Sequence, residues 1–169
     1  ADDYDDPFFL MVGFHRPHTP LTSPKEFWDQ FDREKLPLPP LNPNDLDDMP
    51  WMGKQVAIAG FQDMEGGHYK QITERGHHRD VLKGYLAACT FVDAQIGKVL
   101  DALDASPHRD NTIVVLFSDH GWGIGERYHF KKWGLWDDTT RVPFIIHVPG
   151  ITKAGSQTDA GVTLLDLYP

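Results

Sequence analysis

The segment that most constrains this chain is an apolar run that ends abruptly in polar groups. Residues 111–117 read NTIVVLF and are followed at once by Ser118-Asp119-His120-Gly121-Trp122. An unbroken apolar run rich in β-branched residues is typical of a strand buried on both faces of a largely parallel sheet. In open α/β sheets the ligand crevice lies outside the carboxyl ends of the strands. The sequence therefore predicts Asp119 and His120 side by side at the mouth of a sheet.

This pair of side chains suits a divalent metal ion, and either group could also transfer protons. Asp119 is a hard oxygen ligand that suits Ca²⁺ or Mg²⁺. On chemistry alone, an Asp-His pair indicates Zn²⁺ or Mn²⁺ as readily. A plainer alternative stays open at this point, because Asp and Gly are turn formers and the motif could simply end a strand.

Two further apolar runs and one amphipathic segment complete the expected architecture. Pro7–Gly13 and Val142–Val148 are predicted to be buried strands that neighbour a strand at Thr112–Phe117. Asp80–Ala105 has apolar residues at spacings of three and four, which predicts a long helix packed on one face of the sheet. This order indicates an α/β protein with a mixed, largely parallel sheet sandwiched by helices.

The connecting segments are less regular. Ser23 is a candidate N-cap for a short helix that ends near Phe31, and Leu36–Pro50 is predicted to cross the surface irregularly. The pattern at Trp51–Gly76 is ambiguous, Gly121–Asp138 is interpreted as a functional loop, and a helix is expected from Thr163 onward.

Composition excludes some functions. A net charge of −9 and the lack of a Lys/Arg cluster argue against nucleic-acid binding. No apolar run approaches the ~20 residues that span a bilayer. The 169 residues are enough for one core and are interpreted as a single partial domain over 1–169. The chain starts at Ala1 without a methionine and ends at Pro169 where a helix is expected to begin, so we expect both ends to be truncated.

Two long blocks carry a family resemblance. One continues from Ser118 through GWGIGERYHFKKWGLWDDTTRVPF, and the other reads FFLMVGFHRPHTP over residues 8–20. In order and spacing they resemble the sulfatases of the alkaline-phosphatase-like superfamily, closest to the iduronate-2-sulfatase and choline-sulfatase branch. The resemblance implies that superfamily's fold and hydrolysis of a sulfate monoester. The implied substrate is a sulfated sugar, such as an iduronate 2-sulfate, or a small alcohol sulfate. Family members are periplasmic, secreted or lysosomal.

The resemblance also implies catalytic and metal-binding roles. Asp119 and His120 match presumed metal ligands, with Ca²⁺ expected and Mg²⁺ or Mn²⁺ as alternatives. His18 matches the family histidine that contacts the sulfate and its bridging oxygen. Lys132 matches the lysine on the sulfate oxygens, although a shift of one residue would exchange it with Lys131.

The other polar loop residues carry weaker expectations. His15 and His129 are candidate substrate-binding residues. The alternative for His15 is a loop imidazole without a role, and the alternative for His129 is a surface histidine. His77-His78 is interpreted as a solvated pair. Glu126 is a loop anchor or a catalytic group, and three tryptophans are expected to pack around the loop, namely Trp122, Trp133 and Trp136.

The nucleophile of the family is missing from this sequence. Sulfatases carry a C/S-x-P-S/A-R motif whose first residue is oxidised to formylglycine, and no such motif occurs here. Cys89 lies on the apolar stripe of the predicted helix and is interpreted as a core thiol. Asp2-Asp3 and Asp5-Asp6 are interpreted as an acidic linker, not as the family's other metal ligands. We therefore expect the formylglycine in an N-terminal part beyond this chain, the remainder of the catalytic domain as a partner, and no turnover by the 169 residues alone.

Two alternatives to a sulfatase remain. Phosphatases, phosphodiesterases and phosphonate hydrolases of the same superfamily also place Asp-His-Gly after a strand. A catalytically incompetent α/β module is the other alternative. The block at 15–20 and Lys132 favour the sulfatase.

Overall fold

The computed structural model describes residues 6–59 and 67–168, so the acidic residues at 2–5 lie outside the described part. Its helices are α1 Lys25–Trp28, α2 Trp51–Ala59, α3 Gly67–Glu74, α4 His78–Asp104 and α5 Asp137–Thr140. Its strands are β1 Val114–Phe117, β2 Gly123–Ile124, β3 Phe130–Lys131 and β4 Phe144–His147. Three 3₁₀ segments are η1 Arg33–Lys35, η2 Glu126–Tyr128 and η3 Leu164–Leu167. The α/β class expected from the sequence is confirmed.

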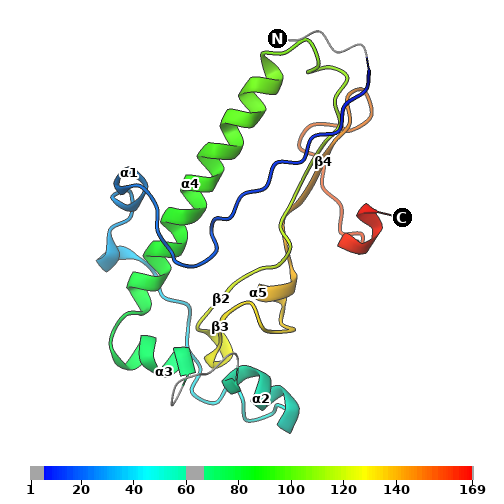
Figure 1. The fold of residues 1–169 in the computed structure, drawn as a ribbon. Coiled ribbons are helices and arrows are strands. Elements are labelled where there is room, and N and C mark those ends of the chain that lie inside the picture. Colours follow the sequence, from blue (N-terminus) through cyan, green and yellow to red (C-terminus); the bar gives the residue numbers. More distant parts are fainter. Residues whose placement is uncertain (1–5, 60–66, 169) are drawn as a thin grey trace.

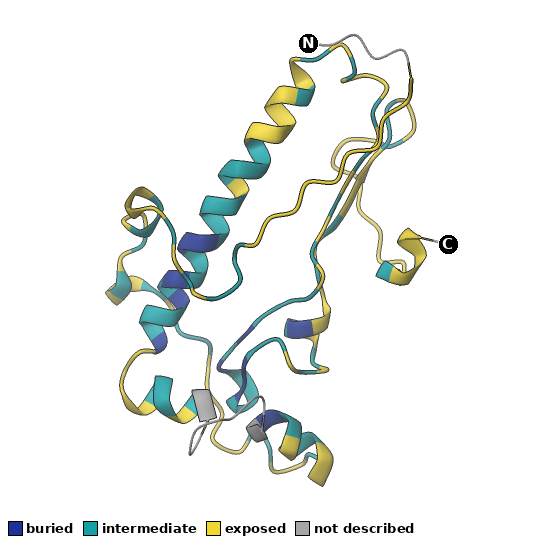
Figure 2. Cartoon of the chain, in the orientation of Figure 1, coloured by how far each residue is buried: buried dark blue, intermediate teal, exposed yellow. Residues whose placement is uncertain are grey.

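The long helix α4 organises the molecule (Figure 1). The helix predicted at Asp80–Ala105 is confirmed with slightly earlier bounds. It packs mainly against α1, η1, α3 and the β2–β3 hairpin. The buried residues lie on its N-terminal half, on the nearby hairpin, and on α2 and α5, whereas its C-terminal half contains only intermediate and exposed residues (Figure 2). The core of the described part therefore lies where the start of α4 meets the hairpin.

Strands β1 and β4 form an antiparallel pair in which Phe117 lies opposite Phe144. Their existence and their pairing as neighbours are confirmed, but the prediction that they are buried on both faces is wrong. The side chains of Val115 and Ile145 are 40% and 57% exposed. Both sheets in the described residues are antiparallel pairs, so the expected parallel pairings do not occur there.

The predicted buried strand at Pro7–Gly13 is wrong. The segment has no regular secondary structure, and Phe9 and Met11 are 87% and 81% exposed. An extended segment becomes a strand only when another strand satisfies its backbone N–H and C=O groups. In the described residues β1 pairs with β4, and no strand pairs with 7–13. Phe8 instead packs on His108, in the turn between α4 and β1, with ring centroids 5.4 Å apart.

The shorter elements depart from expectation in their details. The N-cap of α1 is Pro24 and not Ser23, and the helix ends at Trp28. The ambiguous stretch at 51–76 contains α2 and α3, and the helix expected after Thr163 is the single 3₁₀ segment η3. No helix in the described ranges combines the length and apolar character needed to cross a membrane.

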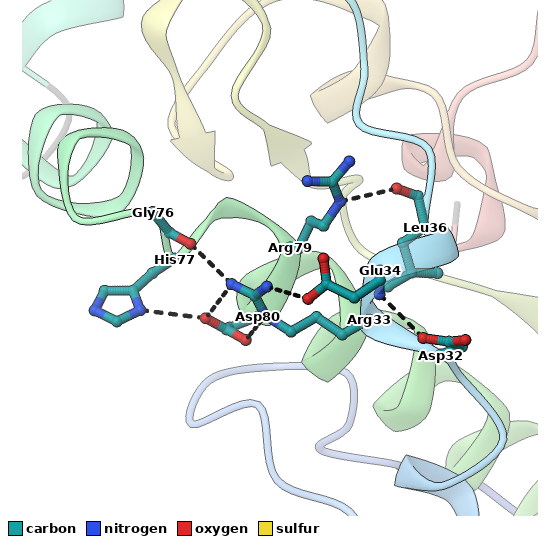
Figure 3. A network of polar contacts seen from close by, with 8 residues as sticks. All are labelled: Asp32, Arg33, Glu34, Leu36, Gly76, His77, Arg79 and Asp80. Atoms are coloured by element: carbon teal, nitrogen blue, oxygen red, sulfur yellow. Dashed lines mark hydrogen bonds and ion pairs between the residues drawn. The ribbon is translucent and has the colours of Figure 1, made fainter.

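A polar network fixes η1 to the start of α4 (Figure 3). The Arg33 guanidinium donates to both carboxylate oxygens of Asp80, over 2.6 and 3.3 Å, and to the Gly76 carbonyl over 3.0 Å. His77 lies 3.2 Å from the same carboxylate, and Arg79 donates to the Leu36 carbonyl. Bidentate pairing of this kind gives geometric specificity as well as energy.

We expect Asp80→Asn to lower the free energy of unfolding of the complete protein by less than about 1 kcal/mol at pH 7, because this ion pair is partly exposed. The hydrogen bond from Arg33, and then the one from His77, hold the pKa of Asp80 below its usual value. The stabilisation is therefore present above pH ~4 and is lost as the pH falls through the lower folded-state pKa. Denaturant unfolding at pH 7 and pH 3 measures this.

Asp104→Asn, the same change at the exposed end of α4, is the control, and we expect it to be neutral or slightly stabilising. A deficit in Asp80→Asn that persists unchanged at pH 3 would contradict the ion-pair account.

Candidate active site

Asp119 and His120 lie side by side at the end of β1. The Nδ1 of His120 lies 2.8 Å from the Gly121 carbonyl oxygen. Because a carbonyl only accepts, Nδ1 carries a proton, and in the neutral ring Nε2 presents a lone pair. That Nε2 is 3.5 Å from Oδ2 of Asp119, whose side chain is exposed. The imidazole and the carboxylate therefore converge on one point in front of the strand.

This geometry fits a divalent cation. Two neighbouring ligands of one ion, each at about 2.0–2.6 Å from it, stand roughly as far apart as these two atoms do. The hydrogen bond at Nδ1 is the kind of support that fixes the tautomer of a metal-bound histidine. Within the described residues no third His, Cys, Asp or Glu joins the pair, so further ligands would have to come from elsewhere.

The turn after this pair is held against α5. Gly121 N–H donates to the Thr139 carbonyl and Trp122 N–H to the Asp138 carbonyl, each over 2.8 Å. A Cβ added at Gly121 would lie well inside van der Waals contact with the Asp138 carbonyl. The motif Asp-His-Gly therefore needs glycine at this position, because the backbone of α5 lies so close to it. The close packing holds the turn that follows Asp119 and His120.

The β2–β3 hairpin lies in the chain between the Asp119–His120 pair and the two lysines, Lys131 and Lys132. Ile124 lies opposite Phe130 and Gly123 opposite Lys131, so the chain leaves the hairpin beside the point at which it entered. Lys132 directly follows Lys131, and Trp122, two residues after His120, directly precedes Gly123. That Lys132 belongs with Asp119 and His120 stays a prediction.

The hairpin turn is conformationally unusual. Arg127, Tyr128 and Lys131 have φ values of 52°, 58° and 77°. Such left-handed backbone is uncommon in residues other than glycine and clusters at functional sites. Two hydrogen bonds to the 43–45 segment hold this turn. The Arg127 N–H donates to the Asp45 carboxylate over 3.1 Å, and the Tyr128 hydroxyl donates to the Pro43 carbonyl over 2.5 Å.

The loop after the N-terminal segment presents His15 and His18 together. Their ring centroids are 4.8 Å apart. Nδ1 of His18 donates to the Thr19 carbonyl over 2.7 Å, which leaves Nε2 for another partner. Arg16 braces the loop through the His18 carbonyl at 3.0 Å and the Thr22 hydroxyl at 2.6 Å.

One turn of α4 touches both blocks. A Cβ at Gly84 would meet Cβ and the carbonyl oxygen of Leu21 at 3.1 and 3.3 Å, so the absence of a side chain lets the histidine loop approach. The next residue, Tyr85, stacks on Trp122 with ring centroids 5.8 Å apart. Leu21, which directly follows the block at 8–20, and Trp122 of the other block therefore contact adjacent residues of α4. This supports the prediction that His18 shares a site with Asp119.

His129 is not a surface histidine. It is 2% exposed and packs against Trp136 at 5.5 Å. Burial, above all, lowers the pKa of its imidazole, and the contacts to the Ala57 backbone and Asp138 oppose that shift. A substrate would reach this ring only after its cover moved, so the position favours a packing role over the predicted substrate contact.

The structure also bears on the expectations for Cys89, Glu126 and the His77-His78 pair. Cys89 is half-buried, and burial raises the pKa of its thiol, which agrees with a core thiol rather than a nucleophile. Glu126 accepts from the Ile124 N–H at 3.3 Å, which supports the loop-anchor alternative. The interpretation of His77-His78 as a solvated pair is wrong for His78, which is 5% exposed and reaches the hairpin. Sequence reasoning missed it because nothing local marks a contact 46 residues away.

We expect Gly121→Ala to destabilise the complete protein by about 1–3 kcal/mol, because the new methyl group overpacks against backbone that cannot rotate away. Gly97→Ala is the matched control. Gly97 lies within α4 with nothing within 4 Å of an added Cβ, so alanine there should stabilise by about 0.5–1 kcal/mol. Thermal and denaturant unfolding of both variants decides, and equal stability of the two would refute the close approach at Gly121.

Comparison with known proteins identifies the family of this chain. The family model described as Sulfatase matches residues 1–169. A sulfatase of Formosa agariphila is 39% identical over 99% of this chain and 32% of its own length. The iduronate 2-sulfatase of Mus musculus is 37% identical over 86% of this chain and 27% of its own length. The chain thus spans about a third of the length of these relatives.

A solved structure gives the same result for the fold. The phosphonate monoester hydrolase from Silicibacter pomeroyi superposes with a TM-score of 0.64 at 30% identity, over 80% of this chain and 27% of that one. The expected resemblance is confirmed by the match along the full sequence. The chain belongs to the sulfatase family.

Proposed function

We propose that the complete protein containing this chain hydrolyses sulfate monoesters with the help of a divalent metal ion. The observation that carries the proposal is the convergence of His120 Nε2 and the Asp119 carboxylate, 3.5 Å apart. Lys132, which directly follows the β2–β3 hairpin, would complete the site. Membership of the sulfatase family supports the same reaction.

The metal ion would be held in part by Asp119 and His120. Ca²⁺ is the proposed ion, with Mg²⁺ or Mn²⁺ as alternatives, since a carboxylate oxygen and a neutral imidazole accept all three. Such an ion supplies Lewis-acid polarisation of a sulfate oxygen. Sulfatases in general also use a formylglycine. The chain lacks the motif for it, so that group would come from the remainder of the same catalytic domain.

Lys132 and His18 would act on the transferring group. Sulfate transfer resembles phosphoryl transfer, in which positioning and electrostatic stabilisation dominate. The Lys132 ammonium would hold sulfate oxygens as negative charge develops. His18 donates from Nδ1 to a carbonyl, so Nε2 is the ring nitrogen left for the substrate. In the doubly protonated ring, Nε2–H would give its proton to the leaving oxygen as a general acid. His15, against the His18 ring, would support that orientation or contact the substrate.

The substrate we propose is a sulfated carbohydrate. The support is the likeness to a protein named iduronate 2-sulfatase, which is 37% identical over 86% of this chain. A small alcohol sulfate is the alternative within the same reaction.

A phosphonate or phosphate ester is the second candidate. The likeness to a phosphonate monoester hydrolase, at 30% identity, specifically favours it. The two candidates differ in the transferred group and share the metal pair, so only turnover separates them.

We expect Asp119→Ala in the complete protein to abolish metal-dependent hydrolysis of 4-nitrophenyl sulfate, because one ligand is lost. Lys132→Ala should lower kcat by about 10²–10³, as does the loss of one electrostatic donor elsewhere. Lys131→Ala is the matched control and should cost much less.

Steady-state rates with Ca²⁺, Mg²⁺ or Mn²⁺, and after chelation, measure these effects. A larger loss in Lys131→Ala than in Lys132→Ala would exchange the two roles. A complete protein that cleaves phosphonate or phosphate esters but no sulfate ester would refute the sulfatase proposal.

A further inference from the structure

His78 is a buried polar residue that the proposed reaction does not use. It opens α4, is 5% exposed, and its Nε2 lies 2.5 Å from the carbonyl oxygen of Ile124. Because that carbonyl can only accept, the imidazole donates. The same ring packs edge-on against Phe130 at 5.3 Å and 74°. Ile124 and Phe130 lie opposite each other and form one rung of the hairpin ladder. His78 therefore contacts both strands of the hairpin at this Ile124–Phe130 rung.

The hairpin turn is shaped around this imidazole. A Cβ at Gly125 would lie 2.9 Å from Cε1 and 3.0 Å from Nε2 of His78. Gly125 also has a φ of 120°, which side chains rarely adopt. Glycine at this position therefore serves two purposes, and one of them is to admit His78.

The Ile124–Phe130 rung lies along the chain between His120 and Lys132, two groups of the proposed reaction. On one strand the chain reaches Ile124 four residues after His120, and on the other Lys132 follows two residues after Phe130. The left-handed Lys131 lies between the rung and Lys132. A shift at the rung would therefore move Lys132 relative to the metal pair, which is anchored separately on α5.

We propose that His78 is a positioning residue for Lys132, acting through its hydrogen bond to Ile124 and its packing on Phe130. This inference rests on the proposed function, in which Lys132 binds the sulfate. Misplacement of a catalytic group by about 1 Å can cost about 10²-fold in rate. The role needs a donor at Nε2 and a ring, so the two features can be removed separately.

The test uses the complete protein and 4-nitrophenyl sulfate. His78→Phe keeps the ring and removes the donor, and we expect kcat to fall by about 10-fold to 10²-fold with little change in KM. His78→Gln restores an N–H donor and should recover part of the loss. In a Lys132→Ala background, His78→Phe should cost at most about 2-fold, because the group it positions is already gone.

Phe27→Leu is the control for simple destabilisation, since Phe27 packs on Phe91 of α4 at 5.3 Å, away from the hairpin. It should leave kcat per folded molecule unchanged. Wild-type kcat in His78→Phe, or a full additive loss in the Lys132→Ala background, would overturn the positioning role.

Amide hydrogen exchange separates failure of this proposal from failure of the proposed function. In His78→Phe, exchange should accelerate at residues 123–132 and remain unchanged at 90–100 within α4. A wild-type protein without sulfate hydrolysis would refute the proposed function. In that case, unchanged exchange at 123–132 would refute the grip of His78 as well, and accelerated exchange would uphold it.

Discussion

The close packing of the N-terminal half of α4 against chain segments on either side holds the described structure together. Small residues there allow the approach, and Gly84 admits Leu21 as Gly125 of the hairpin admits His78. Polar and stacking contacts then fix each segment in place, with His78 on the hairpin and Tyr85 on Trp122. The burial of Tyr85 raises its pKa to about 12, so this ring stays neutral at any ordinary pH. Leu21, directly after one sequence block, and Trp122 of the other block both contact this helix.

The fold could be predicted where a pattern is local. The apolar stripe gives α4, and the apolar runs before Ser118 and after Pro143 give β1 and β4. Burial could not be predicted in the same way, because it depends on what covers the strand. Residues 7–13 have the same apolar character as β1, yet no strand pairs with them in the described part. Phe9 and Met11 in that segment are 87% and 81% exposed.

The candidate site divides along a similar line. Asp119 with His120, and His15 with His18, are near neighbours in sequence, and the structure places each pair together. The place of Lys132 depends on the hairpin register, which neither the Gly-rich stretch nor the charge pattern reveals. His78 could not be found from sequence because its partners lie 46 and more residues away. The burial of His129 was equally hidden, although the tryptophan that covers it was expected to pack on the loop.

His18 and Asp119 come from two distant sequence blocks, and in the proposed function they serve one reaction. The most direct measurement is the rate of the complete protein and of His18→Ala on aryl and alkyl sulfates whose leaving groups span a range of pKa. A general acid matters most when the leaving group is poor. We expect His18→Ala to lower the rate only slightly for 4-nitrophenyl sulfate, and the loss of rate to grow steadily toward alkyl and sugar sulfates. A deficit that is absent, or equal for every leaving group, would contradict it.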